Sequence, residues 1–367
     1  MMFGKKPQQV KKCLLIIDPQ RDFCDPTGSL YVPGADKDMH RLAKIVGHYD
    51  HVIITLDTHP KEHIANASAW KILDKDFRVT KVSPPPFSQV YRRPNDSNYK
   101  NHLQSTYCIR SVDGRNDTEV KYVYAKTPTD FLQVSQMFDS IKNGPLTLWP
   151  DHCLGTETNQ AFSTGNEVQE ELKRKLDVME KEGKVTYYRK GQNPFVESFS
   201  ALMMEDGRLI NPALLVELSK YDVIHVAGEA STHCVRRTME DLARICQGGK
   251  NLVDNGARLR LRRPGHLDAL NNHYGVQVVL TKSKLAKLFT RVRIIQNCMS
   301  PVEVPNKDEL IERFMTHPSL VDKFIELKVD ASGTPVDELG NHVFEPRGWG
   351  LERDGMDSKW GKRVTGQ

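Results

Sequence analysis

Two apolar runs that each end in an aspartate constrain the fold of this chain more than any other feature. The runs are CLLIIDP at 13–19 and HVIITLD at 51–57. A strand with one face in water alternates apolar and polar residues, whereas these runs are continuously apolar. Such runs suit strands that are buried on both faces of a parallel sheet. Three further stretches, at 184–190, 222–228 and 291–297, are predicted to be strands of the same sheet.

Helical patterns lie between the predicted strands. Residues 36–48 and 166–182 are amphipathic, and residues 234–246 place apolar side chains at helical spacing. Residues 211–220 begin with Asn-Pro, which is a normal helix start. This alternation predicts an α/β fold with a mostly parallel sheet. Ligands bind such folds beyond the carboxyl ends of the strands, so we expect the functional residues there.

Other stretches do not fit the strand and helix alternation. Residues 71–145 contain SPPPF and YRRPNDSNYKN and few long apolar runs, and residues 247–290 are strongly basic. Both are predicted to be insertions, the first beside the expected site as a lid or an interaction surface. Residues 331–367, rich in glycine and charge, are predicted to form an extended tail.

The net charge of +5 is concentrated in one block. Ten Lys and Arg and two Asp lie between Lys250 and Arg293, a local charge of +8. A basic block can bind nucleic acid or another anionic partner, or it can be a solvated insertion. We favour the solvated insertion because no nucleic-acid motif accompanies the charge.

Apolar run lengths and cysteine spacing bear on location. No run approaches the roughly 18 consecutive apolar residues that a membrane helix needs, so we expect no membrane partner. Seven cysteines at irregular spacing, without a CxxC pair, argue against a secreted disulfide framework. The sequence therefore predicts a reducing compartment and a cytoplasmic location.

Cys234 is the candidate nucleophile. It follows the small-residue turn GEASTH and opens a predicted helix. Free N–H groups at a helix N-terminus can lower the pKa of a thiol and bind a developing oxyanion. Taken alone the signal is weak, because most cysteines in such positions simply pack.

Two charged residues follow other predicted strands. Asp18 comes directly after CLLII, where it can act as a base for a thiol or serve as a turn residue before Pro19. Lys190 ends the strand at 184–190, where it can pair with a carboxylate and a thiolate or reach out to solvent.

A third set has the chemistry of a metal site. Asp57 and His59 stand in a D-x-H pattern at a strand end, where alternate side chains face one side. His63 follows them, and His152 stands in Trp149-Pro150-Asp151-His152. Asp and His ligands with an open position are typical of a catalytic metal site.

Five segments together carry a family resemblance. They are LLIIDPQRDFCDPTGSLYVPGA, ITLDTHPKEHIANAS, LWPDHCLGT, RKGQNPFVESFSAL and HVAGEASTHCVRRTMEDL. In this order they resemble the nicotinamidase branch of the isochorismatase-like cysteine hydrolases. The resemblance covers roughly residues 11–70, 145–246 and 291–303, a little under half of the chain. It implies a three-layer α/β/α domain over 11–330, interrupted by the two insertions, with 331–367 as a C-terminal extension.

The resemblance implies a role for each matching position. The catalytic residues would be Asp18, Lys190 and Cys234. One divalent metal would be held by Asp57, His59 and His152, with His63 a further ligand in some relatives. Zinc is the first choice for such ligands, with iron or manganese as alternatives.

The resemblance also implies the surroundings of the substrate. Phe23, Trp149 and Phe199 would line the ring pocket. A cis peptide is expected at Glu229-Ala230, with the Ala230 and Cys234 amides facing one oxyanion. The chain departs from the family at Thr58, where an aromatic residue is usual, and at Thr232, where an acid is usual; Phe199 stands where tyrosine is common.

The predicted function is hydrolysis of nicotinamide to nicotinate and ammonia through a cysteine thioester, in NAD salvage. Two alternatives remain open. One is a related hydrolase or amidase of different substrate, such as an N-carbamoyl hydrolase. The other is an inactive scaffold that binds an anionic partner. We expect a small-molecule substrate and no nucleic-acid partner, and the sequence leaves a homo-oligomer open.

Overall fold

The computed structural model describes residues 10–92, 107–109, 118–141, 145–155, 162–247, 282–302 and 325–336. Its main sheet has seven strands in the order β12-β11-β10-β9-β1-β2-β8. Their bounds are β1 (Lys12–Ile17), β2 (His51–Asp57), β8 (Val185–Lys190), β9 (Val223–Gly228), β10 (Val292–Ile295), β11 (Ile325–Val329) and β12 (Pro335–Val336). All neighbouring strands pair in parallel except β11 and β12. The five predicted strands and the mostly parallel sheet are therefore confirmed.

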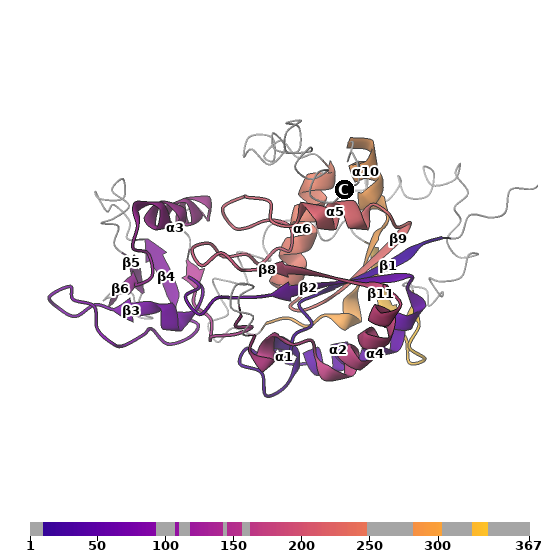
Figure 1. The fold of residues 1–367 in the computed structure, drawn as a ribbon, viewed down its shortest axis with the longest axis horizontal. Helices are drawn as coiled ribbons and strands as arrows, with labels where there is room; N and C mark the ends of the chain where they lie inside the picture. The colour runs from indigo at the N-terminus through magenta and orange to yellow at the C-terminus, as the bar shows by residue number, and fades with distance from the viewer. Residues whose placement is uncertain are drawn as a thin grey trace, which may run out of the picture.

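Helices cover both faces of this sheet (Figure 1). One face carries α1 (Arg21–Cys24), α2 (Ala35–Ile45) and α4 (Glu170–Lys181), and the other carries α5 (Pro212–Leu218), α6 (Cys234–Gln247) and α10 (Lys282–Thr290). The domain therefore has the expected three-layer α/β/α architecture. The short helices are η1 (Val46–His48), η2 (Ala67–Ala69), η4 (Thr164–Asn166) and η5 (Gln296–Cys298).

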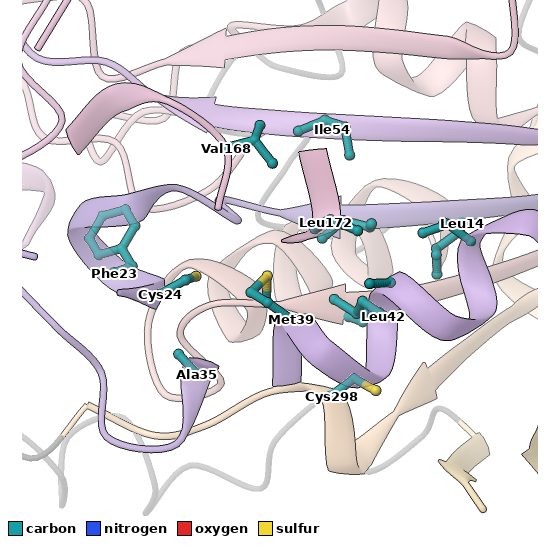
Figure 2. Packing of buried hydrophobic residues seen from close by; sticks show 14 of the residues in the cluster. Leu14, Phe23, Cys24, Ala35, Met39, Leu42, Ile54, Val168, Leu172 and Cys298 are labelled. Carbon is teal, nitrogen blue, oxygen red and sulfur yellow. The ribbon is translucent and has the colours of Figure 1, made fainter. Parts of the chain in front are cut away.

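The continuous apolar run of β1 supplies both layers of the core. Leu14 and Ile16 belong to the cluster that also holds Met39 and Leu42 of α2 and Leu172 of α4. Figure 2 shows Leu14, Met39, Leu42 and Leu172 in this cluster. The alternate residues Leu15 and Ile17 belong to the cluster formed with α5, α6 and α10. Successive side chains of a strand point to opposite faces, so a strand buried on both faces has no polar position.

The segment predicted as the first insertion forms a second sheet. Its five antiparallel strands are ordered β3-β6-β5-β4-β7. They are β3 (Trp70–Ile72), β4 (Gln89–Arg92), β5 (Tyr107–Ile109), β6 (Thr118–Tyr122) and β7 (Leu146–Thr147). Helix α3 (Pro128–Ser140) begins at a Thr127 capping box and packs Phe138 into the same cluster as Trp70. This unit lies at the side of the main sheet (Figure 1).

The structure describes only part of the predicted second insertion, the basic block and the C-terminal segment. Strand β12 pairs with β11, so the main sheet continues beyond residue 330. Most of the basic block lies outside the described residues, and only α10 of the second predicted insertion is described. The division into 11–330 and 331–367 stays a prediction. Within the described ranges, every helix is too short or too polar to cross a bilayer.

Candidate active site

Four strands of the main sheet deliver the candidate residues to one edge. Asp18 follows β1, Asp57 ends β2, Lys190 ends β8, and Cys234 begins α6 after β9. The parallel register aligns Asp57 with Lys190. Strand β1 lies between β2 and β9, so the chain order reverses beside it. The crevice at such a reversal is the usual ligand site of an open α/β sheet.

Lys190 is the centre of this cluster. Its Nζ atom lies 3.0 Å from Asp18 Oδ2, 3.1 Å from Asp57 Oδ1 and 3.5 Å from Cys234 Sγ. It also donates to the Ser198 carbonyl oxygen at 3.1 Å. The side chain is buried, so it does not reach solvent, which was the alternative left open by the sequence. Burial disfavours the ammonium, but Asp18 and Asp57 hold the pKa of Lys190 well above its usual range.

Asp18 is fixed on both its backbone and its side chain. Its φ of 46° lies in the left-handed region, and its N–H donates to the Thr55 carbonyl oxygen at 3.1 Å. The Thr55 hydroxyl donates to Oδ1 at 2.7 Å. Burial raises the pKa of Asp18, against the opposing effect of Lys190. A carboxylate so placed is an effective proton acceptor, because raised basicity accompanies a fixed orientation.

The thiol of Cys234 corrects one expectation. The helix N-terminus predicted a lowered thiol pKa, but burial raises the pKa of Cys234 well above its usual value, with Lys190 only opposing the rise. Asp18 and Asp57 add to the rise, and the thiol donates a hydrogen bond to Asp18. The resting Cys234 side chain is therefore a thiol with the Asp18 carboxyl group beside it.

Asp57, His59 and His152 form a group that could hold a metal ion. Asp57 Oδ2 lies 3.0 Å from His59 Nε2 and 3.6 Å from His152 Nε2. All three side chains are buried, and their ligand atoms lie within 4.8 Å of one another. The His59 Nδ1 atom is 3.0 Å from the Gly191 carbonyl oxygen, and the His152 Nδ1 atom is 2.7 Å from that of Pro150.

These backbone contacts decide which ring nitrogen is available. A carbonyl oxygen only accepts, so each Nδ1 carries a proton, and each Nε2 atom, which is turned toward Asp57 Oδ2, is the one that could bind a metal ion. Carbonyl partners of this kind are the usual support for metal-binding histidines. The donor set therefore fits a divalent metal ion.

His63 lies beside this group but not in it. It shares a second potential metal group with His59 and Glu197. Its Nδ1 atom accepts the Ala65 N–H at 3.2 Å, and its buried Nε2 atom has no hydrogen-bond partner among the described residues. The suggestion that His63 adds a ligand to the first group stays a prediction.

One pocket is lined both by Cys234 and by the metal-binding group. The structure places the three predicted aromatic residues Phe23, Trp149 and Phe199 in its wall, together with Ala230 and Cys234. The Glu229-Ala230 peptide is cis, as expected. Sequence reasoning missed four other lining residues, which are Leu30, Glu197, His233 and Val302.

The sequence contained a signal for some of these missed residues and none for others. His233 stands next to the nucleophile and Glu197 seven positions after Lys190, so both lie inside quoted motifs. Burial and Arg236 lower the pKa of His233 to about 4, so the ring is neutral between Trp149 and Phe199. Val302 comes from a segment with no chemical signal.

Two of the positions at which the sequence departs from the family pattern, Thr58 and Thr232, lie outside the pocket wall. Thr58 is fully buried and approaches Asn166 Nδ2 at 3.5 Å. The Thr232 hydroxyl accepts the Val302 N–H at 3.1 Å. Phe199 is the one departure that lines the pocket.

Known proteins resemble this chain in structure and in sequence. No family model matches the chain. The crystal structure of the yeast nicotinamidase Pnc1p bound to the inhibitor nicotinaldehyde has a TM-score of 0.43 at 16% identity, covering 83% of this chain and 93% of that chain.

Two curated relatives match by sequence. The nicotinamidase of Saccharomyces cerevisiae is 28% identical over 107 residues, which are 28% of this chain and 46% of that protein. The nicotinamidase of Acinetobacter baylyi is 25% identical over 257 residues, which are 69% of this chain and 85% of that protein. The chain thus spans under half of the first relative and most of the second. In sequence, the chain is therefore similar to nicotinamidases of the isochorismatase-like cysteine hydrolases.

Proposed function

We propose that this chain hydrolyses nicotinamide to nicotinate and ammonia. Both curated relatives are nicotinamidases. The observation that carries the proposal is the position of Lys190, whose Nζ atom contacts the base, the nucleophile and a metal-binding carboxylate at once. The pocket that Cys234 and Asp57 help to line also contains the aromatic residues Phe23, Trp149 and Phe199, which suit contact with a pyridine ring.

In the acylation half of the reaction, Cys234 attacks the carboxamide carbon. Asp18 takes the thiol proton, the S–C bond forms, and the carbonyl π electrons move to oxygen. The Ala230 and Cys234 amides stabilise this oxyanion. When the oxyanion collapses, the C–N bond breaks and Asp18 gives its proton to the leaving nitrogen, which departs as ammonia.

In the deacylation half, water takes the place of ammonia. Asp18 removes a proton from the water, whose oxygen attacks the thioester carbon, and the C–S bond then breaks. The thiolate regains a proton from Asp18, and nicotinate leaves. Lys190 keeps its proton throughout, and its charge stabilises the anionic form of Asp18 or Cys234 at each stage.

Asp57, His59 and His152 would hold the metal ion through Oδ2 and the two Nε2 atoms. When bound, the ion supplies a Lewis acid that can accept the pyridine nitrogen lone pair and so orient the ring. We assign zinc first, because two imidazoles and one carboxylate with an open position are typical of catalytic zinc. Iron and manganese are the alternatives.

The cellular setting is part of the proposal. All seven cysteines are free thiols, which supports a reducing, cytoplasmic location. Nicotinate formed there would enter NAD salvage. A homo-oligomer stays a prediction, and the alternative of an inactive scaffold is disfavoured because no catalytic group is missing from the cluster.

The test is ammonia release from nicotinamide by the full chain. Wild-type protein should release ammonia, and Cys234→Ala should not. Cys246→Ala is the matched control, because Cys246 is also buried and lies at the other end of α6. Benzamide, which lacks the ring nitrogen, should be a poor substrate, and exhaustive chelation should remove activity. Activity that survives Cys234→Ala would overturn the mechanism.

A further inference from the structure

The mechanism does not use Glu229, a buried acid of the site region. Glu229 is fully buried and immediately precedes Ala230, whose amide is proposed to bind the oxyanion. Among the described residues, no N–H or O–H group donates a hydrogen bond to its Oε1 atom. A buried carboxyl group is costly unless it is paired or hydrogen-bonded, so its presence at this position calls for a physical account.

Glu229 and its neighbours bind the backbone of one residue in a distant segment. Ser300 N–H donates to Glu229 Oε2 at 3.0 Å, and the Ser300 carbonyl oxygen accepts the Ser231 N–H at 2.8 Å. The two contacts lie on either side of Ala230. The Val302 N–H adds a bond to the Thr232 hydroxyl. Residues 300–302, which we call the strap, thus run along the turn before the nucleophile.

The strap is tied in turn to helix α2. The Ser300 hydroxyl donates to Asp38 Oδ2 at 2.6 Å. Arg41, one turn later on α2, binds Asp38 Oδ1 through Nη2 and donates from Nε to the Asn297 carbonyl oxygen at 2.5 Å. Asp38 is itself almost fully buried. Its charge is therefore balanced by Arg41.

The protonation of Glu229 completes the network. Burial raises the pKa of Glu229 well above its usual range, and the Asp38 carboxylate raises it further. The group therefore carries a proton, and Oε1 can donate it to Asp38 while Oε2 accepts from Ser300. One guanidinium, one carboxylate and one neutral acid leave no uncompensated charge.

Other hydrogen bonds of the turn lead to β1 and α6, and the Glu229 side chain adds one to the strap. Glu229 N–H donates to the Ile17 carbonyl oxygen at 2.8 Å, and the Ala230 carbonyl oxygen accepts from Val235 at 3.2 Å. These bonds hold the two ends of the turn to β1 and α6. The Glu229 side chain and Ser231 hold its outer side to the strap.

We propose that Glu229, acting through Ser300 and Asp38, is a positioning residue that holds the Ala230 amide in place for the oxyanion. The proposal rests on the proposed function. It requires the hydrogen-bonding capacity of Glu229 and not its charge, since an apolar side chain of the same size would fill the space but leave Ser300 N–H unpaired. A misplaced donor weakens transition-state binding more than substrate binding.

The experiment compares Glu229→Met with Glu229→Gln in the full chain. Methionine keeps the length of the side chain and removes both hydrogen bonds. Glutamine keeps an acceptor for Ser300 and a donor for Asp38. Glu229→Met should lower kcat by roughly 10- to 100-fold, less than full loss of one oxyanion donor, with KM for nicotinamide little changed. Glu229→Gln should restore kcat to within about threefold of wild type.

The matched control is Glu240→Met. Glu240 is a buried glutamate on α6 that pairs with Arg236 at 3.0 Å, away from the turn. Its replacement should leave kcat unchanged. A Glu229→Met variant with wild-type kcat would overturn the proposal, as would failure of glutamine to restore kcat. If Glu229→Met does not fold, Ser300→Ala takes its place, and its kcat should fall by at least about threefold. An unchanged kcat in Ser300→Ala would overturn the proposal.

Failure of the proposed function would appear differently. Wild-type protein would then release no ammonia from nicotinamide. In that case, hydrogen exchange of the 229–234 amides tests whether Glu229 holds the Ala230 amide in place. Glu229→Met should exchange faster there than wild type and Glu229→Gln, with exchange in β2 unchanged. Equal exchange in all three proteins would overturn the proposal.

Discussion

The Nζ atom of Lys190 lies 3.1 Å from Asp57 Oδ1, so the lysine beside the nucleophile also contacts the metal-binding group. This contact follows from the parallel register of β2 and β8, which sets the two residues side by side at the sheet edge. The catalytic cluster and the metal-binding cluster are therefore one connected set of buried charges. Perturbing the lysine should affect both.

Lys190→Met tests this connection. The change leaves Asp18 and Asp57 buried without their shared cation, so the free energy of unfolding should fall by about 3–5 kcal/mol. Activity should fall by at least about 100-fold, because the Asp18 carboxylate and the Cys234 thiolate lose a fixed positive charge. Urea unfolding of metal-depleted protein and ammonia release are the measurements. Lys71→Met, in the small sheet, is the control, and equal stability of the two variants would contradict the prediction.

Asn166→Ala should weaken metal binding without touching a ligand. Asn166 Nδ2 donates to the Cys153 carbonyl oxygen at 2.6 Å and to that of Asp57 at 3.2 Å. It thereby joins the two segments that carry the ligands. Loss of such support typically weakens metal affinity by about 10- to 100-fold. Competition with a chromophoric chelator measures the affinity.

The control for this change is Asn297→Ala. Asn297 exchanges two hydrogen bonds with the Val329 backbone, outside the metal-binding group. Its removal should leave metal affinity unchanged. If Asn166→Ala bound zinc as tightly as Asn297→Ala, the structure would have assigned Asn166 the wrong role.

His225 should make stability fall in mild acid. Burial, with Arg293 and Lys12, lowers its pKa to about 3, and the Tyr49 hydroxyl lies 2.7 Å from its Nδ1 atom. An unfolded histidine titrates near pH 6.5, so between about pH 6.5 and 3 the unfolded chain binds more protons. The stability from the neutral ring is complete above pH 6.5 and declines below it, by up to about 1.4 kcal/mol per pH unit.

Comparison of wild type with His225→Gln isolates this effect from other acid-sensitive groups. The variant is less stable at pH 7, and the gap in free energy of unfolding should narrow toward pH 4. Urea titrations at half-unit pH steps measure it. Parallel stability curves for the two proteins would show that His225 does not titrate as described.

Phe199→Ala should raise KM for nicotinamide more than it lowers kcat. Phe199 lines the pocket and packs edge-on against Trp149, with ring centroids 6.4 Å apart. One aromatic contact contributes about 0.5–1.5 kcal/mol, so KM should rise by roughly 2- to 12-fold. Phe162→Ala, outside the pocket wall, is the control. An unchanged KM would exclude ring contact with Phe199.

Local patterns were sufficient for most of the fold. The strand at 13–19 and the helix at 234–246 were predictable because burial on both faces, or on one helical face, leaves its period in the sequence. The antiparallel sheet around Trp70 was not predicted, since its strands are short and pair across long separations. Strand order and register are likewise set by contacts between distant segments.

The candidate site likewise has features that the sequence could predict and features that it could not. Asp18, Lys190 and Cys234 could be proposed from their strand ends and motifs. The raised pKa of the Cys234 thiol could not be predicted, because it depends on how deeply the assembled fold buries the sulfur. Val302 and Leu30 were missed because only the folded chain brings them to the pocket.

The sequence by itself therefore determined the residue types, the strand ends and the family resemblance of this protein. The tertiary structure decided which groups meet: Lys190 with Asp57, and Glu229 with Ser300. The physical reason is that chemical identity is local to the chain, whereas burial and electrostatic coupling depend on the distances that folding creates.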